Sequence, residues 1–146
     1  LGDINVTADN TVPQDNSNIN PEDYVNTGIE FIDVLPINGY TSEKDQSDIE
    51  LAASANFSWN LPTDYIKSTK DFWATSSHHI AVSGTITPTG KILRVGIIEP
   101  DGIRRCIYAT GNFSYNFPLD KTGFYSVYAI NDNSEVVNLT GGYLTY

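Results

Sequence analysis

The sequence predicts an all-β fold, an antiparallel two-sheet β-sandwich of about seven to nine strands with an irregular acidic N-terminal segment. Apolar residues recur at every second position in several short segments, as they do in strands with one buried face. Turn residues separate these segments roughly every 8 to 12 residues, and no long segment has helical periodicity. An immunoglobulin-like or a jelly-roll-like sandwich fits this pattern, and a closed barrel is the competing architecture.

The first segment predicts no regular structure. Between positions 7 and 23 only three residues are apolar and two are prolines, so this stretch buries too little surface to offset its ordering entropy. We therefore expect residues 1–27 to be a flexible acidic lead or linker, followed by a single β-sandwich domain over residues 28–146. Residues 29–37 are apolar and β-branched, and Pro36 confines that strand to a sheet edge or a strand end.

The next run has two interpretations. Apolar residues alternate with polar ones from Ile49 to Trp59, which predicts a strand with one buried face. Ser47 and Glu50, however, are spaced as a capping box, so a helix at the start of this run stays open.

The remaining elements follow from alternation and turn residues. Residues 91–99 and 103–110 flank Pro100-Asp101-Gly102, a pattern that predicts a β-hairpin. Further strands are expected at 80–86, 113–117, 124–130 and 135–146.

The composition excludes two classes of protein and divides the chain. A net charge of -10 and a pI near 4.3 argue against a nucleic-acid binder, and no apolar run approaches the ~20 residues of a membrane-spanning helix. Residues 1–50 hold eleven of the 18 acidic residues and one base, Lys44, whereas the rest of the chain is charge-balanced. The acidic third therefore reads as a solvated leader to a neutral, aromatic-rich body.

Several features indicate an exported protein. Asn, Ser and Thr are abundant and Lys and Arg are scarce. A single cysteine, Cys106, excludes an intramolecular disulfide. The chain opens at Leu1 without a signal-peptide pattern, as expected if a signal has been removed. We therefore predict a secreted or cell-surface location.

One segment carries a family resemblance. Residues 120–129, DKTGFYSVYA, resemble the tyrosine-corner strand of immunoglobulin-like sandwiches, with Gly123, Tyr125 and Val127 in the matching positions. Val127 stands where that family often has a cysteine. Over residues 72–146 the order of strands and turns is similar to small secreted β-sandwich modules of Gram-positive bacteria, most of them without an assigned function. The resemblance implies a fold and an extracellular location, and no activity.

The residues with reactive side chains predict no catalytic centre, no metal site and no cofactor. His78 and His79 are adjacent, so on a strand they point to opposite faces and cannot share a metal. Cys106 follows two arginines, but a lone cysteine is usually a small buried hydrophobe. Asp64 and Asp71, as a carboxylate pair, are not placed by the sequence in an apolar pocket.

The acidic cluster Glu43, Asp45, Asp48 and Glu50 raises the hypothesis of a calcium site, because calcium prefers several oxygen ligands. These residues lack the spacing of an EF-hand loop, and Asp48 and Glu50 would lie on the wet face of a strand. A solvated strand face is the preferred interpretation.

The aromatic residues are the best candidates for a binding surface. We single out Trp59, Tyr65 and Trp73 as candidate ligand-binding residues, since rigid aromatic side chains anchor many interfaces. Phe72 and Trp73 must face opposite ways if the chain is extended there, which would expose one of them. The alternative is that Trp59 fills the core and Trp73 closes one end of the sandwich.

The sequence thus predicts a secreted or cell-surface, non-catalytic β-sandwich module that binds or adheres to an extracellular protein or glycan. The alternative is a structural spacer domain of a surface assembly with no specific ligand, and a hydrolase is a distant third. No oligomeric state is predicted.

Overall fold

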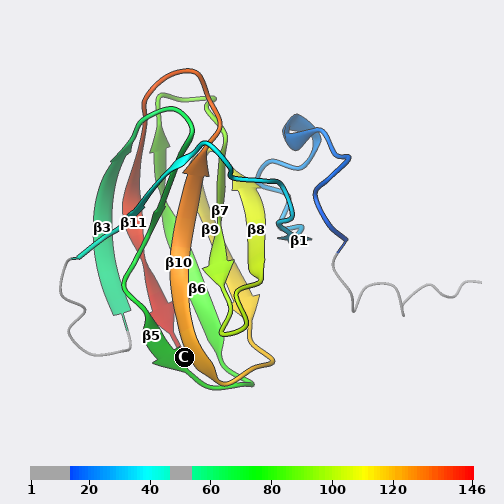
Figure 1. The fold of residues 1–146 in the computed structure, drawn as a ribbon, viewed down its shortest axis with the longest axis vertical. Helices are drawn as coiled ribbons and strands as arrows, with labels where there is room; N and C mark the ends of the chain where they lie inside the picture. The colour runs from blue at the N-terminus through cyan, green and yellow to red at the C-terminus, as the bar shows by residue number, and fades with distance from the viewer. Residues whose placement is uncertain (1–13, 47–53) are drawn as a thin grey trace, which may run out of the picture.

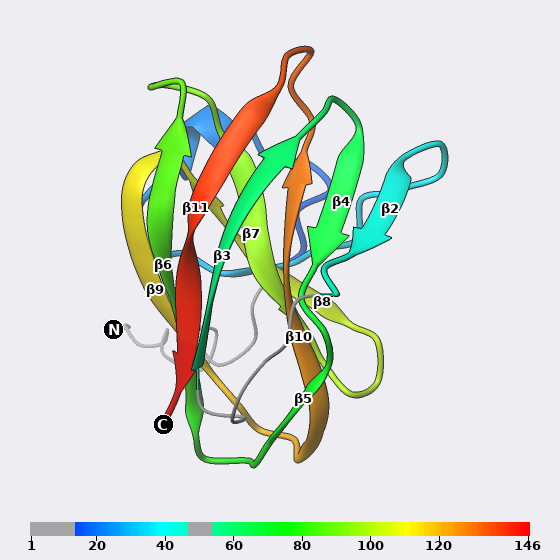
Figure 2. The ribbon, with the colours of Figure 1, turned by 90° about the vertical axis from the view of Figure 1, so that its left-hand side faces the viewer.

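The computed structural model describes residues 14–46 and 54–146, which form two β-sheets packed face to face. Figures 1 and 2 show the two layers from directions at right angles. The predicted two-sheet sandwich is confirmed. Within the described ranges, no helix is long and apolar enough to cross a membrane.

Eleven strands and one short 3-10 helix, η2 (Pro21–Asp23), make up the described chain. The strands are β1 (Phe31–Ile32), β2 (Thr41–Lys44), β3 (Ser54–Leu61), β4 (Tyr65–Ser68), β5 (Phe72–Ala74), β6 (His79–Thr87), β7 (Leu93–Ile98), β8 (Arg104–Ala109), β9 (Gly111–Pro118), β10 (Gly123–Asn131) and β11 (Val137–Thr145).

The first sheet has seven strands in the order β1-β8-β7-β10-β4-β2, with β5 also pairing with β10. The second has four strands in the order β3-β11-β6-β9. All pairs are antiparallel except β2 with β4. The strand count exceeds the expected seven to nine because β1, β2 and β5 are short additions to the edges and one end of the first sheet.

Local sequence patterns account for most of these elements. The hairpin predicted around Pro100-Asp101-Gly102 is β7 and β8, and Gly102 adopts the positive φ of 89° that this turn needs. β1 lies at a sheet edge, as predicted from Pro36. The part of the alternating run from Ser54 to Trp59 is a strand, β3. The helix considered for the start of this run would fall on residues 47–53, which lie outside the described residues.

The main core lies between the sheets. Its buried side chains alternate along each strand, for example Ile80, Val82 and Ile86 on β6. Leu61, Leu139 and Val127 come from three further strands and are fully buried. Replacing such a leucine by alanine typically costs about 2–5 kcal/mol.

A second apolar cluster lies on the outer face of the seven-stranded sheet. It contains Phe31, Tyr108, Tyr128 and Ile130, with Tyr24 packed edge-on against Phe31 at 5.1 Å between ring centroids. Residues 14–40 lie over the half of the sheet that carries this cluster (Figure 1).

The structure differs from the expected flexible lead at residues 14–27. Asn16 is 2% exposed and donates from Nδ2 to Asp33 Oδ1 at 3.0 Å and to Tyr108 Oη at 3.1 Å. The Asn26 backbone N–H donates to the Tyr108 carbonyl. A few polar contacts thus hold a segment too poor in apolar residues to be predicted as ordered. Residues 1–13 lie outside the described residues, and the domain boundary at residue 28 stays a prediction.

The segment that resembles a tyrosine corner has the corresponding local geometry. Tyr125 is buried at the start of β10, and its hydroxyl donates to the Lys121 carbonyl at 2.6 Å. A tyrosine-corner hydroxyl bonds to backbone a few residues upstream in the same way. The wider resemblance to Gram-positive immunoglobulin-like modules stays a prediction.

Candidate functional site

Two aromatic side chains stand exposed at one end of the seven-stranded sheet. Trp73 on β5 is 51% exposed and Phe124 on β10 is 57% exposed. They are paired across the two strands, and their rings meet edge to face at 5.1 Å between centroids. We call Trp73 and Phe124 the aromatic pair.

Strand alternation explains why this pair is exposed. Phe72 points inward, stacks on Tyr143 and is buried, so its neighbour Trp73 points outward, as predicted for an extended Phe72-Trp73. On β10, Tyr125 is buried between the sheets and Phe124 therefore faces out. Residues 14–40 cover the half of this outer face that carries the second apolar cluster. β5 pairs with β10 at the opposite end of the sheet, where the aromatic pair lies (Figure 1).

The other two candidate aromatics are not exposed in this way. Trp59 is 3% exposed and stacks on Phe57, so the alternative that it fills the core describes its position. Its indole N–H donates to Asp45 Oδ2 at 2.8 Å. Tyr65 is half-buried, and its hydroxyl donates to Glu43 Oε1 at 2.5 Å.

Trp59 and Tyr65 thus belong to a polar cluster beside β4, and Trp73 is not part of it. Lys67 contacts Glu43 at 3.4 Å and lies 6.0 Å from the centre of the Trp59 ring. The hydrogen bond from Tyr65 and the nearby Lys67 lower the pKa of the Glu43 carboxyl, and the same bond raises the pKa of Tyr65. Of the four acids in the calcium hypothesis, the structure describes Glu43 and Asp45, and both accept hydrogen bonds from aromatic side chains. Asp48 and Glu50 lie outside the described residues.

The most buried charges lie under the covered half of the seven-stranded sheet. Arg94 donates from Nη1 to Asp33 Oδ1 at 2.7 Å, and both side chains are buried. Arg104 and the Tyr128 hydroxyl also donate to Asp33. Burial raises the pKa of Asp33, but the pairing with Arg94 and the hydrogen bonds from Asn16 and Tyr128 outweigh it, so the pKa lies below its ordinary value.

A second ion network lies at the end of the same sheet. Arg105 donates to Glu30 and, at 3.0 Å, to Glu99, and Lys121 donates to Glu99 at 3.0 Å. Together with Asp33 and Glu43, Glu30 shows that carboxylates of the acidic first third pair with cations of the body. The expectation of a merely solvated leader therefore does not hold for these residues.

The side chains considered for catalysis occupy structural positions. Cys106 is fully buried, and burial raises the pKa of its thiol, which opposes thiolate formation. His79 begins β6 and stacks on Tyr146, and Asp71 forms an exposed ion pair with Lys44. Among residues 14–46 and 54–146, no three His, Cys, Asp or Glu residues are grouped to hold a metal ion.

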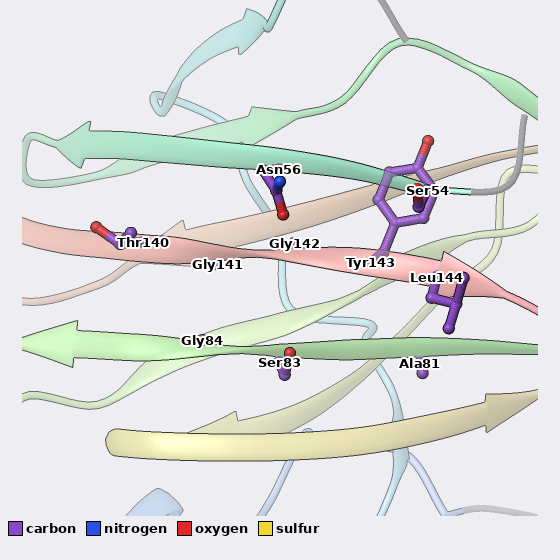
Figure 3. A pocket seen from close by; sticks show the side chains of 10 residues that line it. All are labelled: Ser54, Asn56, Ala81, Ser83, Gly84, Thr140, Gly141, Gly142, Tyr143 and Leu144. Carbon is purple, nitrogen blue, oxygen red and sulfur yellow. The ribbon is translucent and has the colours of Figure 1, made fainter. Parts of the chain in front are cut away.

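The outer face of the four-stranded sheet is a second candidate surface. It contains a groove of about 660 Å³ over β3, β11 and β6, lined by Asn56, Ser83, Thr140 and Leu144 among others (Figure 3). Gly142 lies between Asn56 on one neighbouring strand and Ser83 on the other, so the missing side chain leaves a depression. Neither this groove nor Phe124 was predicted from the sequence. Strand alternation could have indicated that Phe124 points to the opposite face from Tyr125.

Comparison with known proteins shows the fold alone. No family model matches the sequence, and no curated protein matches it. The crystal structure of PliG from Aeromonas hydrophila, a periplasmic lysozyme inhibitor of g-type lysozyme, aligns with a TM-score of 0.52 and 14% identity over 73% of this chain and 97% of that chain. A mutant of PliG from Escherichia coli aligns with a TM-score of 0.46 and 12% identity over 73% of this chain and 99% of that chain. This chain is thus similar in fold to the Aeromonas inhibitor.

Proposed function

We propose that this chain is an exported, non-catalytic module that binds a protein partner through the aromatic pair. The observation that carries the proposal is the exposure of Trp73 and Phe124, side by side on a rigid sheet. Tryptophan is among the residues that most often dominate binding energy at protein interfaces, because it buries a large area at little entropic cost.

The surroundings of the pair suit a protein interface. Ile98 on the neighbouring strand β7 is half-buried and faces the same side as Phe124, so apolar surface extends beyond the two rings. Lys44 and Asp71 form an ion pair next to the start of β5, which supplies a polar border. An apolar centre with a polar rim is the usual anatomy of such interfaces.

A lysozyme is the partner class to test first. The Aeromonas protein of similar fold is an inhibitor of g-type lysozyme located in the periplasm, and its whole length is nearly covered by the alignment. This similarity supports an enzyme-binding role outside the cytoplasm for this chain. A location in the periplasm or beyond the cell also agrees with the exported composition.

Inhibition of lysozyme tests the proposal directly. The purified protein is titrated into a g-type lysozyme that is clearing a suspension of bacterial cell walls, and complex formation is followed by calorimetry. We expect stoichiometric inhibition, and we expect Trp73→Ala to weaken binding by about 2 kcal/mol, or roughly thirtyfold.

Tyr146→Ala is the matched control, because Tyr146 is an equally exposed aromatic residue that lies beyond β11 of the other sheet. It should leave the calorimetric affinity for the lysozyme unchanged, a measurement made without cell walls. If neither g-type nor other lysozymes bind, the lysozyme assignment is wrong. If Trp73→Ala and Tyr146→Ala bind equally well, the aromatic pair is not the site.

A further inference from the structure

The described strands of the four-stranded sheet contain no Asp, Glu, Lys or Arg. Its strands read SANFSWNL, HIAVSGTIT, GNFSYNFP and VNLTGGYLT, so within the described strands all Asp, Glu, Lys and Arg residues belong to the other sheet. The chain as a whole carries 18 acids and 8 bases. An uncharged face of this size is therefore unusual for this molecule.

Strand register arranges the outward side chains of this sheet in rows. Ser58, Thr140, Thr85 and Asn112 form one row across the four strands, and Asn56, Gly142, Ser83 and Ser114 form the next. Hydroxyl and amide groups dominate both rows. Because each of these groups can both donate and accept hydrogen bonds, the face suits a partner whose own groups also do both.

The groove is centred on the second row and extends along the strands to Ser54, Leu144 and Ala81 of the next row (Figure 3). Gly142 lines the groove, and a Cβ at this position would meet the Ala55 carbonyl oxygen at 2.5 Å and Asn56 Oδ1 at 2.7 Å, so the close packing of the two strands requires glycine here. The Asn56 amide therefore lies beside the glycine and borders the groove. Close packing of the backbones thus leaves a trough lined by polar atoms.

Aromatic rings continue the face beyond the groove. The next row consists of Ser54, Leu144, Ala81 and Asn116. His79 and Tyr146 follow, joined by two backbone hydrogen bonds. Their rings are stacked with 5.4 Å between centroids and an interplanar angle of 18°. Tyr146 is 55% exposed, so one flat ring surface is open to a ligand.

We propose that this face binds an uncharged polysaccharide, with the chain lying in the groove and one sugar ring against Tyr146. Sugar hydroxyls complement the Ser, Thr and Asn groups, and the apolar face of a sugar ring complements an aromatic ring. A polyanion would find no cation on this face and would meet a chain of net charge -10. A protein surface usually carries many charged groups, for which the face offers no partner.

This inference is independent of the protein-binding proposal, because the aromatic pair belongs to the other sheet. Affinity electrophoresis tests it with intact protein in native gels that contain β-glucan, α-glucan, mannan, galactan or soluble chitin derivatives without charge. Gels with polygalacturonate provide the anionic comparison. We expect at least one neutral polymer to retard the protein and polygalacturonate to leave it unretarded.

Two variants locate the site. Ser83→Lys places a long charged side chain at the groove, and Tyr146→Ala removes the exposed ring. We expect Ser83→Lys to weaken retardation at least tenfold and Tyr146→Ala to weaken it about threefold to tenfold. Ser134→Lys makes the same substitution in the exposed turn between β10 and β11 and should change nothing. Circular dichroism confirms that each variant folds.

Three results would overturn the inference. The first is the absence of retardation by every neutral polymer, and the second is retardation that Ser83→Lys and Ser134→Lys reduce equally. The third is concentration-dependent dimerisation in sedimentation runs that Ser83→Lys abolishes, which would assign the face to a second copy of this chain.

Discussion

The two sheets of the sandwich present contrasting outer faces. The seven-stranded sheet holds every charged residue that lies in a described strand, and half of its outer face is covered by residues 14–40. The four-stranded sheet has an open, uncharged outer face of hydroxyl and amide groups. Figure 2 shows β3, β11, β6 and β9 side by side, with no segment of the described chain laid across them.

The acidic residues of the first third of the chain account for part of this contrast, because several of them form ion pairs with the seven-stranded sheet. Asp33, Glu30 and Glu43 pair with Arg94, Arg105 and Lys67 of the seven-stranded sheet and its edge. The ion pairs thus fasten the N-terminal segment to the seven-stranded sheet, and only a hydrogen bond from Tyr115 to Glu30 reaches β9 among the described residues. The described strands of the four-stranded sheet stay without Asp, Glu, Lys or Arg. Mutations in the two buried pairs, Asp33 with Arg94 and Glu30 with Arg105, should therefore affect stability strongly, whereas polar changes on the four-stranded sheet should affect binding alone.

The largest expected effect is on the buried pair of Arg94 and Asp33. Arg94→Met removes the cation but leaves the Asp33 carboxylate buried, which should lower the free energy of unfolding by about 3–5 kcal/mol. Urea denaturation measures it. Lys44→Met is the control, because its ion pair with Asp71 is exposed and should contribute less than about 1 kcal/mol. If both substitutions lowered the free energy of unfolding equally, the buried ion pair would contribute no more to stability than the exposed one.

A pH dependence should follow from the lowered pKa of Asp33. Groups with a depressed folded-state pKa stabilise the fold above their unfolded-state pKa and lose that contribution as pH falls through the folded value. The free energy of unfolding should therefore fall from about pH 4 downwards, and less steeply in Asp33→Asn, whose side chain cannot be protonated. Denaturation of both proteins at several pH values measures the two slopes. Parallel slopes would show that Asp33 does not contribute.

A smaller effect is expected where the N-terminal segment meets the sheet. Asn16→Ala removes two donated hydrogen bonds and one accepted from the Val34 N–H, at a cost of about 1–3 kcal/mol. Hydrogen exchange at residues 14–27 should accelerate more than exchange in β10. Asn18→Ala, at an exposed position, should leave both quantities unchanged. Uniform exchange in the wild-type segment at the rate of an unfolded peptide would instead support a flexible lead.

The smallest effect concerns two buried tyrosines, one on each sheet. The Tyr143 hydroxyl on β11 is buried and has no hydrogen-bond partner in the described structure, so Tyr143→Phe should raise stability by up to about 1 kcal/mol. Tyr125→Phe should lower it by about 1 kcal/mol, because that hydroxyl donates to Lys121. Thermal melting distinguishes the signs, and a loss in both variants would contradict the account of Tyr143.

Period-two alternation was enough to predict much of the fold and one residue of the candidate site. It placed Phe57 and Trp59 on the buried face of one strand, and it required Phe72 and Trp73 to face opposite ways. It could not predict β2, whose four residues are all exposed and carry no alternation. Nor could it predict the burial of Asn16, because that depends on side chains 17 and 92 positions away.

The choice among aromatic candidates needed the structure for a related reason. Trp59 ends a long alternating run and Trp73 follows Phe72 in a short one, but only the pairing of β5 with β10 shows that Trp73 lies beside an exposed Phe124. The neutral groove depends on the register of three strands, which places Gly142 between Asn56 and Ser83. Such long-range pairing is not readable from local pattern.

Amide chemical-shift mapping of the isotopically labelled protein tests most directly whether the two sheets bind different partners. A g-type lysozyme and a neutral oligosaccharide that retards the protein are added in separate titrations. We expect the lysozyme to shift amides around Trp73 and Phe124, and the oligosaccharide to shift those of Asn56, Ser83 and Thr140. Shifts on the same sheet with both ligands, or none with either, would contradict it.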